Sequence, residues 1–284
     1  PLLAGFPIVA PRSRRRSPLQ ATVLALGVAL SGVVDFDAGV FRFAARIPGP
    51  RDVALREGLA RRFGLVTAVD DLSRARAVAE HRFGAVQGVR DFLYVHADIG
   101  IGAGLFLDGR LYRGVRGLAG EIGHLILDPN GVWCSCGQRG CLETFATPAA
   151  LERMVRELST PSLAPSWLGI VAAAREEDRT ALNLLHSAAE RLGQAIAAAI
   201  NLFGVDLVVL GGCLPAASPR VLDTVRQVAQ RGCLTGMTPT VHHTELNEDA
   251  AAQGAATLAL DDLFAADDHA LALATRKGGS AAAG

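Results

Sequence analysis

The stretch GEIGHLILDPNGVWCSCGQRGCLE, from Gly120 to Glu143, holds three of the five cysteines of this 284-residue chain and a histidine ten residues before the first of them. Structural Zn²⁺ takes four nitrogen or sulfur ligands in a tetrahedron, and a Cys-x-Cys spacing places two thiolates on one tight turn. One candidate ligand set follows: His124, Cys134, Cys136 and Cys141. Because this set fills all four positions, it favours a structural zinc over a hydrolytic one. The alternative is a set of metal-free thiols, but so polar a loop offers cysteines little apolar burial.

Acidic residues accompany this loop. Asp70 and Asp71 end the segment LVTAVDD (65–71), at the kind of strand edge where α/β folds place ligand sites. Glu121 precedes the histidine by three residues, and Glu143 follows the last cysteine by two. Carboxylates around one cleft suit a polyhydroxylated ligand, and one of them can serve as general base toward a hydroxyl group. Any one of these acids taken alone fits a solvated surface position better, so the hypothesis depends on their shared neighbourhood.

Two glycine-rich segments follow predicted strands. They are GIGAG (100–104) and VLGGC (209–213), and they supply Gly100, Gly102, Gly104, Gly211 and Gly212. Backbone N–H groups in such turns can cradle a phosphate, which would place these glycines on a nucleotide side. Tight turns that need positive φ explain them equally well, because a glycine run alone is a weak signal.

The composition excludes several classes of protein. Half of the residues are hydrophobic and a fifth are charged, so the chain can bury a sizeable core. The formal net charge is zero, which gives no argument for nucleic acid or an anionic membrane. The longest apolar stretch is too short to span a bilayer, and the N-terminus lacks the order of a secretory signal. We therefore expect a cytoplasmic protein with reduced thiols and no membrane partner.

The order of predicted elements indicates an α/β protein of two lobes. Residues 1–20 read as a disordered lead-in; its arginine run suits a solvated tail better than a nucleic-acid-binding arm. Residues 21–90 form a partial N-terminal lobe with two strands before residue 45, a helix over 51–64, the strand 65–71 and a helix over 72–85. Residues 91–247 form a larger lobe that contains a hairpin at Asp108–Gly109, a helix over 180–204, a strand over 205–212 and the zinc loop 120–145. A helix over 248–265 completes the first lobe, and 266–284 are expected to be a disordered tail.

Several segments together resemble the ROK family, named for repressors, open reading frames and kinases. The signature is GLAGEIGHLILDPNG followed by CSCGQRGCLE, and the spacing of its histidine and cysteines matches the zinc site of the family without insertion. LSGVVD (30–35), the segment 79–114, DLVVLGGCL (206–214) and EDAAAQGAATLAL (248–260) are similar to other family segments. The resemblance covers about Leu24 to Leu260. It implies a two-lobed, actin-like or ribonuclease-H-like α/β fold with a zinc-binding loop, closing over a sugar, and a homodimer.

The resemblance also implies roles for individual residues. Asp71 aligns with the catalytic aspartate that takes the proton from the sugar hydroxyl, and Asp70 aligns with a sugar-binding asparagine. Glu121, His124 and Glu143 align with further sugar contacts. His124 would bind zinc through one ring nitrogen while its loop lines the sugar pocket.

Departures from the kinase pattern concern the phosphate loops. Kinase members carry Asp-x-Gly-Gly-Thr near the N-terminus; nothing of that kind precedes Thr22, and the first strands of the family are missing here. The second loop, usually Gly-Thr-Gly-Ile-Gly-Ala-Gly, has Asp98 where the threonine is expected, and a carboxylate repels phosphate. Phosphoryl transfer depends on positioning and charge stabilisation, so both changes disfavour catalysis.

Three functions remain. The favoured one is the sugar-sensing effector domain of a ROK-family transcriptional regulator, N-terminally incomplete, which binds DNA only through a helix-turn-helix domain absent from this chain. The alternative is an ATP-dependent kinase of glucose or an N-acetylhexosamine, using ATP, Mg²⁺ and Asp71. The third is a family member with only a folding and dimerisation role. The sequence does not name the hexose or N-acetylhexosamine that binds.

Overall fold

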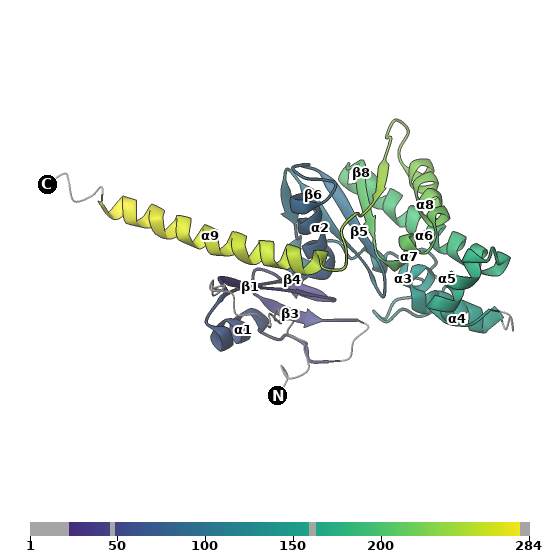
Figure 1. Cartoon of the computed structure of the whole chain (residues 1–284), viewed down its shortest axis with the longest axis horizontal. Helices are drawn as coiled ribbons and strands as arrows, with labels where there is room; N and C mark the ends of the chain where they lie inside the picture. Colours follow the sequence, from purple (N-terminus) through teal and green to yellow (C-terminus); the bar gives the residue numbers. More distant parts are fainter. Residues whose placement is uncertain (1–22, 46–48, 159–162, 279–284) are drawn as a thin grey trace, which may run out of the picture.

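A computed structural model of the chain describes residues 23–45, 49–158 and 163–278 (Figure 1). The expected lead-in 1–20 lies outside these residues. The larger sheet has five strands in the order β7-β6-β5-β8-β9. Its bounds are β5 Phe92–Ala97, β6 Ile101–Leu107, β7 Arg110–Tyr112, β8 Leu207–Gly211 and β9 Thr240–His243. β5 is buried along its whole length because it pairs with β6 on one side and, in parallel, with β8 on the other.

The hairpin between β6 and β7 confirms a prediction from the sequence. Asp108 has φ 53° and Gly109 has φ 74°, so both turn residues are left-handed, as a two-residue hairpin with an Asp-Gly turn requires. β9 was not predicted. Its four residues carry two histidines and no run of apolar residues, so its pattern gives no strand signal.

The N-terminal part contains two small sheets. β1 (Ala25–Leu30) pairs in parallel with β4 (Val66–Asp71), and β2 (Val33–Asp35) pairs antiparallel with β3 (Val40–Phe43). Three strands thus precede residue 45 where the sequence predicted two, because the chain breaks at Gly32, whose φ is 131°. α1 (Leu55–Phe63) ends as predicted at Gly64, which adopts the left-handed conformation of a C-cap.

Two helices lie between the small β1–β4 sheet and the five-stranded sheet (Figure 1). α2 (Leu72–Phe83) packs on β5 and β6, and α9 (Ala250–Gly278) packs on β1, β4 and α2. Their close approach depends on Gly254, where an added Cβ would lie 1.7 Å from the carbonyl oxygen of Ala75. This packing supports the proposed completion of the 21–90 lobe by residues 248–265.

The C-terminal helix runs further than the sequence predicted. α9 continues past residue 265 to Gly278. The structure therefore differs from the predicted disordered tail, which was expected to start at residue 266. The physical reason is composition: residues 265–277 are rich in alanine and leucine, and no glycine or proline interrupts them before Gly278. Residues 279–284 lie outside the described part.

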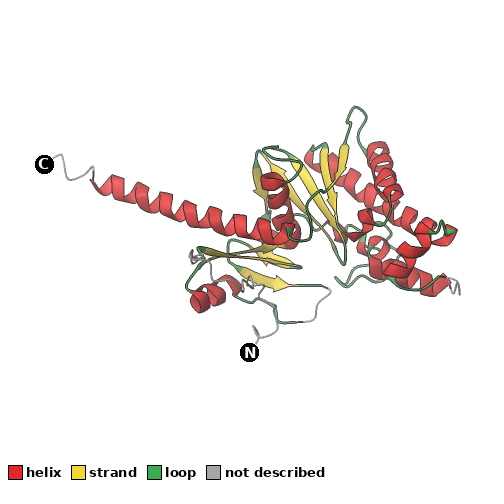
Figure 2. Cartoon of the chain, in the orientation of Figure 1, coloured by secondary structure: helices red, strands yellow, loops and turns green. Residues whose placement is uncertain are grey.

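The remaining helices form a layer against the face of the five-stranded sheet that points away from β1 and β4 (Figure 2). They are α3 Glu143–Ala146, α4 Pro148–Leu158, α5 Trp167–Arg175, α6 Arg179–Phe203, α7 Cys213–Ala216 and α8 Pro219–Gly232. α6 carries the stripe of buried residues that its helical spacing predicted, including Leu185, Leu192 and Ile196, and it packs against α8. Among the described helices, none combines the length and apolar character needed to cross a bilayer.

Candidate functional site

The four predicted zinc ligands come together in the structure. Their candidate ligand atoms all lie within 4.8 Å of one another. The Sγ of Cys134 is 3.7 Å from Nδ1 of His124, and the Sγ atoms of Cys136 and Cys141 are 3.6 Å apart. Two thiolates bound about 2.3 Å from one tetrahedral Zn²⁺ lie about 3.8 Å apart. The donor set and its spacing therefore fit a structural zinc ion.

Backbone hydrogen bonds shape the loop for this arrangement. His124 ends the short 3₁₀ helix Ile122–His124, and Cys141 lies just before α3. Between them, the N–H of Cys134 donates to the carbonyl of Gln138, and the N–H of Gly137 donates back to the carbonyl of Cys134. Gly137 turns the chain with φ 90°, which a residue with a side chain rarely adopts. The loop is thus folded by its own backbone, and a zinc ion on these four ligands would join its two ends.

His124 links the zinc cluster to the acidic residues. Its Nδ1 faces the thiols, whereas its Nε2 lies 4.0 Å from Oε2 of Glu121. A carboxylate beside the distal nitrogen of a metal-binding histidine fixes the orientation of the ring. The Glu121 carboxylate thus lies next to the zinc cluster, close enough to interact with the His124 ring.

The acids Asp71, Glu121 and Glu143 form a chain of interacting carboxyl groups. Burial raises the pKa of Asp71 to about 6, and the charge of Glu121 adds to this, against the lowering effect of Arg74. Burial also raises the pKa of Glu121, with a smaller contribution from Glu143. Oε1 of Glu143 accepts a hydrogen bond from the N–H of Ile101 at 2.8 Å. The three carboxyl groups thus form one acidic cluster between α2 and the zinc loop.

Asp71 also caps α2. Its Oδ1 accepts hydrogen bonds from the N–H groups of Ser73 and Arg74, at 2.8 and 3.1 Å. This capping holds the carboxylate in one place at the carboxyl end of β4. A fixed carboxyl group with a pKa near neutrality can accept a hydrogen bond or a proton from a ligand hydroxyl.

Asp70 has a different environment. Its Oδ1 accepts from Nε of the buried Arg74 at 2.6 Å, and its Oδ2 accepts from Nε of Arg113 at 3.0 Å. Arg74 also donates to the carbonyl oxygens of Gly117 (2.6 Å) and Val34 (3.0 Å). Both oxygens of Asp70 are therefore engaged in holding protein segments together. The sequence analysis assigned no role to Arg74 or Arg113; the only signal was the i,i+4 spacing of Asp70 and Arg74.

The predicted phosphate-side glycines serve close packing in the structure. Cβ atoms added at Gly102 and Gly104 would lie 2.4 Å from side-chain atoms of α2, namely Oγ of Ser73 and Cβ of Ala77. Added Cβ atoms would also lie close to neighbouring atoms at the other three positions: Gly100 (Glu143 Oε1, 2.9 Å), Gly211 (Tyr94 hydroxyl, 2.4 Å) and Gly212 (Ala97 carbonyl oxygen, 2.2 Å). Packing alone thus accounts for these glycines.

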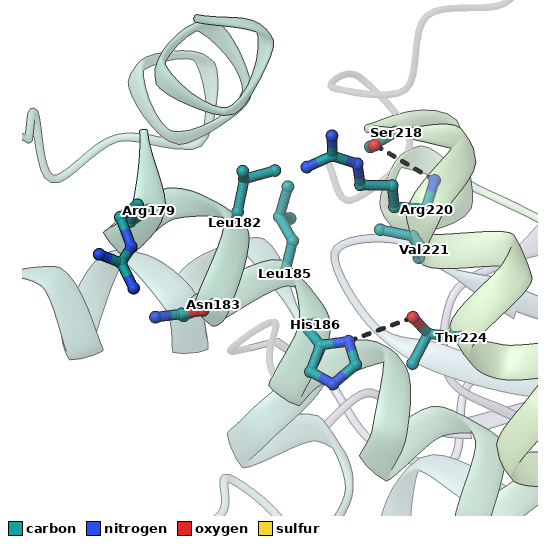
Figure 3. A pocket seen from close by; sticks show the side chains of 9 residues that line it. All are labelled: Arg179, Leu182, Asn183, Leu185, His186, Ser218, Arg220, Val221 and Thr224. Carbon is teal, nitrogen blue, oxygen red and sulfur yellow. Dashed lines mark hydrogen bonds between the residues drawn. The ribbon is translucent and has the colours of Figure 1, made fainter. Parts of the chain in front are cut away.

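Hollows lie at several places on the described part of the helical layer. One lies between α6 and α8 (Figure 3); Leu182, Leu185 and Val221 are among its lining residues, and Nδ1 of His186 is 3.2 Å from the Thr224 hydroxyl. None of its lining residues belongs to the acidic cluster or the zinc cluster. Another has a volume of about 350 Å³ and adjoins the zinc loop, with Glu143 in its wall. Of these two hollows, only the second shares a residue with the candidate site.

One prediction concerns the charge on Asp71. Asp71→Asn keeps a side-chain oxygen for the cap but removes the ionisable group. The pKa of Asp71 rises from 3.8 to about 6 on folding, so the folded protein favours the protonated carboxyl group. The stability that this protonated group contributes is fully present below pH 3.8 and is lost as the pH rises through about 6. We therefore expect the free energy of unfolding of D71N to exceed that of the parent by about 1–3 kcal/mol at pH 7. This difference should shrink as the pH falls toward 4.5. Urea unfolding across this pH range measures it, and a pH-independent difference would contradict the assignment.

The fold and the site together define a two-lobed α/β protein with a cluster of carboxyl groups beside a loop whose histidine and cysteines fit a zinc ion. The ROK family model matches residues 14–262, and the chain belongs to the ROK family. This family includes sugar kinases and transcriptional repressors, and solved members share the actin-like α/β fold.

Relatives come from both branches. An N-acetylglucosamine repressor of Escherichia coli O157:H7 is 36% identical over 210 residues, which is 72% of this chain and 52% of the repressor. A ROK family glucokinase from Streptomyces griseus, in complex with glucose and AMPPNP, has TM-score 0.77 and 30% identity over 85% of this chain and 83% of its own. A ROK family transcriptional regulator, homologous to the E. coli MLC protein, has TM-score 0.76 and 30% identity over 85% of this chain and 63% of its own. The chain spans between about half and two thirds of the length of the repressors it matches.

Proposed function

We propose that this chain is the sugar-sensing part of a ROK family transcriptional regulator, a cytoplasmic homodimer with a structural zinc ion. A hexose or N-acetylhexosamine would bind at the acidic cluster, held by Asp71, Glu121, His124 and Glu143. Their carboxylates suit sugar hydroxyls because each can accept two hydrogen bonds. Asp70 would not contact the sugar itself; its carboxylate accepts a hydrogen bond from the N–H of Asp71 and would hold that residue in position.

The observation that carries this proposal is the state of the glycine loop after β5. A phosphate-binding loop must point free N–H groups at the phosphate. Here the N–H of Asp98 donates to the carbonyl of Gly100, and the N–H of Ile99 donates to the Asp98 carboxylate at 2.9 Å. The N–H of Ile101 donates to Glu143. The N–H groups of these three residues are therefore bonded within the protein and do not point at a phosphate. The Asp98 carboxylate also adds a negative charge, which repels the phosphates of ATP.

The second candidate is an ATP-dependent sugar kinase of the glucokinase or N-acetylhexosamine kinase type. Asp71 favours it, because a fixed carboxyl group with a pKa of about 6 is mostly ionised at pH 7 and can take a proton from a sugar hydroxyl. ATP and Mg²⁺ would then be required at the glycine loops. The glucokinase complex with glucose and AMPPNP supports this candidate as an analogy.

Measuring sugar binding and ADP release on the same samples separates the two candidates. We expect a hexose or N-acetylhexosamine to bind by titration calorimetry, with no sugar-dependent ADP release in a coupled assay. Asp98→Thr is a matched control that restores the residue typical of the kinases; on its own it should leave sugar binding intact. Sugar-dependent ADP release by the parent, abolished in D71N, would overturn the regulator proposal in favour of the kinase.

A further inference from the structure

The hollow beside the zinc loop shares one residue with the acidic cluster. Glu143 is common to both, whereas Asp71, Glu121 and His124 do not line the hollow. The carboxyl interactions run in order: Asp71 interacts with Glu121, and Glu121 interacts with Glu143. Glu143 is therefore the acidic residue that joins the candidate sugar contacts to this hollow. A ligand that contacts Glu143 has further space beyond it.

One wall of this hollow is an exposed tryptophan. Trp133 lies next to the zinc ligand Cys134 and leaves 66% of its surface exposed. It is nevertheless held in place: a backbone bridge pairs it with Arg139, and the guanidinium of Arg139 lies 4.3 Å from the ring centroid. An exposed but fixed aromatic ring in a concave site is a preorganised apolar surface, at which little side-chain entropy is lost on binding.

Polar groups complete the hollow around the ring. They belong to Ser135, Glu143, Thr144, Thr147 and Arg153. The hydroxyl groups of Thr144 and Thr147 donate to the carbonyls of Cys141 and Glu143, and the Thr147 oxygen also accepts from the N–H of Ala150. Lone pairs on both hydroxyl oxygens still offer acceptor capacity, more of it on Thr144. The flat indole of Trp133, with hydrogen-bond acceptors around it, suits a pyranose ring. Such a ring has an apolar C–H face and carries hydroxyl groups around its edge. The volume of about 350 Å³ lies within the range of sites for small molecules.

We infer that the ligand of this chain is larger than a monosaccharide: a disaccharide or glycoside with one ring at the acidic cluster and its second group stacked on Trp133. This inference rests on the proposed sugar site and names its substrate class. Zinc then has a direct role in recognition, because it fixes the segment that carries the stacking residue.

Paired titrations test this inference. The chain has two tryptophans, and Trp167→Phe leaves Trp133 as the sole indole; because Trp167 lies in α5, outside the hollow, this control should leave all affinities unchanged. Glucose would be compared with maltose and cellobiose, and N-acetylglucosamine with diacetylchitobiose. For at least one pair, we expect the disaccharide to bind about three- to tenfold more tightly and to change the fluorescence of Trp133. In Trp133→Ala that ratio should approach one while the zinc content stays at one per chain, and Trp133→Phe should retain most of it.

Other results would contradict either the disaccharide inference alone or the proposed function as well. Equal affinities within every pair, or a W133A variant that retains the full preference, would overturn the disaccharide inference and leave the sugar site intact. A W133A variant that loses zinc would be replaced by W133F, whose retained ring must then preserve the preference. Binding of no sugar at all would overturn the proposed function together with this inference.

Discussion

Replacing Cys141 by serine should remove bound zinc and, with it, sugar binding. Cys141 is fully buried, and its Sγ lies 3.6 Å from that of Cys136. Serine offers a far poorer ligand than thiolate, and three remaining donors do not close a structural tetrahedron. Structural zinc contributes about 10–16 kcal/mol to the folding of small zinc domains. In this chain only the loop depends on it, so we expect a loss of several kcal/mol in stability.

The effect on the ligand should be larger than the effect on the core. Residue 141 forms a bridge with Ile126, and the next two residues include Glu143 at the start of α3. Loss of metal therefore releases both ends of the loop and, with them, the orientation of His124 and Glu121. We expect at least a tenfold loss of sugar affinity, which corresponds to about 1.4 kcal/mol.

Elemental analysis, thermal unfolding and calorimetry on the same preparations measure these changes. Cys233→Ser is the matched control, because Cys233 is a partly buried thiol outside the cluster and should leave the zinc content at one per chain. Parent protein purified without chelator that contains no zinc, or C141S protein that retains it, would show that the four residues are not the ligand set.

The clustering of the four candidate zinc ligands could be predicted from the sequence because the signal is local. His124 and the three cysteines lie in one short stretch, and the glycines among them mark the turns. The helices α1 and α6 were predicted for the same reason: apolar spacing and a terminal glycine are read within one segment. The strand β9 was missed because it is specified by its neighbour β8 and not by its own pattern.

The environment of Asp70 could not be predicted from the sequence, because it depends on contacts between residues far apart in the chain. The bonds of Arg74 to Val34 and Gly117 join residues 40 and 43 positions apart, and no local pattern encodes them. Sequence reasoning also expects arginine at the surface, whereas Arg74 is 1% exposed. The position of Trp133 beside Glu143 is likewise visible only after the zinc loop has folded back on α3.

Replacing Arg74 by methionine should be the most destabilising single change around the acidic cluster. The Arg74–Asp70 pair is almost completely buried, with side-chain exposures of 1% and 0%. Methionine fills a similar volume but leaves the Asp70 carboxylate with Arg113 as its remaining cationic partner, and it removes the donors to Val34 and Gly117. Removing one partner of a buried ion pair costs about 3–5 kcal/mol, because the other charge stays buried. We expect a loss of that size in the free energy of unfolding by urea.

A double-mutant cycle distinguishes this cause from general damage to packing. Asp70→Asn combined with Arg74→Met removes both charges, so the double variant should be more stable than Arg74→Met alone. Arg113→Met is the matched comparison; because Arg113 is 24% exposed, we expect its loss to be about 1–2 kcal/mol. A double variant as unstable as R74M would place the damage in packing and not in the uncompensated charge. If the charge is the cause, Arg74 and Arg113 together occupy both carboxylate oxygens of Asp70, and of these two neighbouring aspartates only Asp71 is proposed to contact a sugar directly.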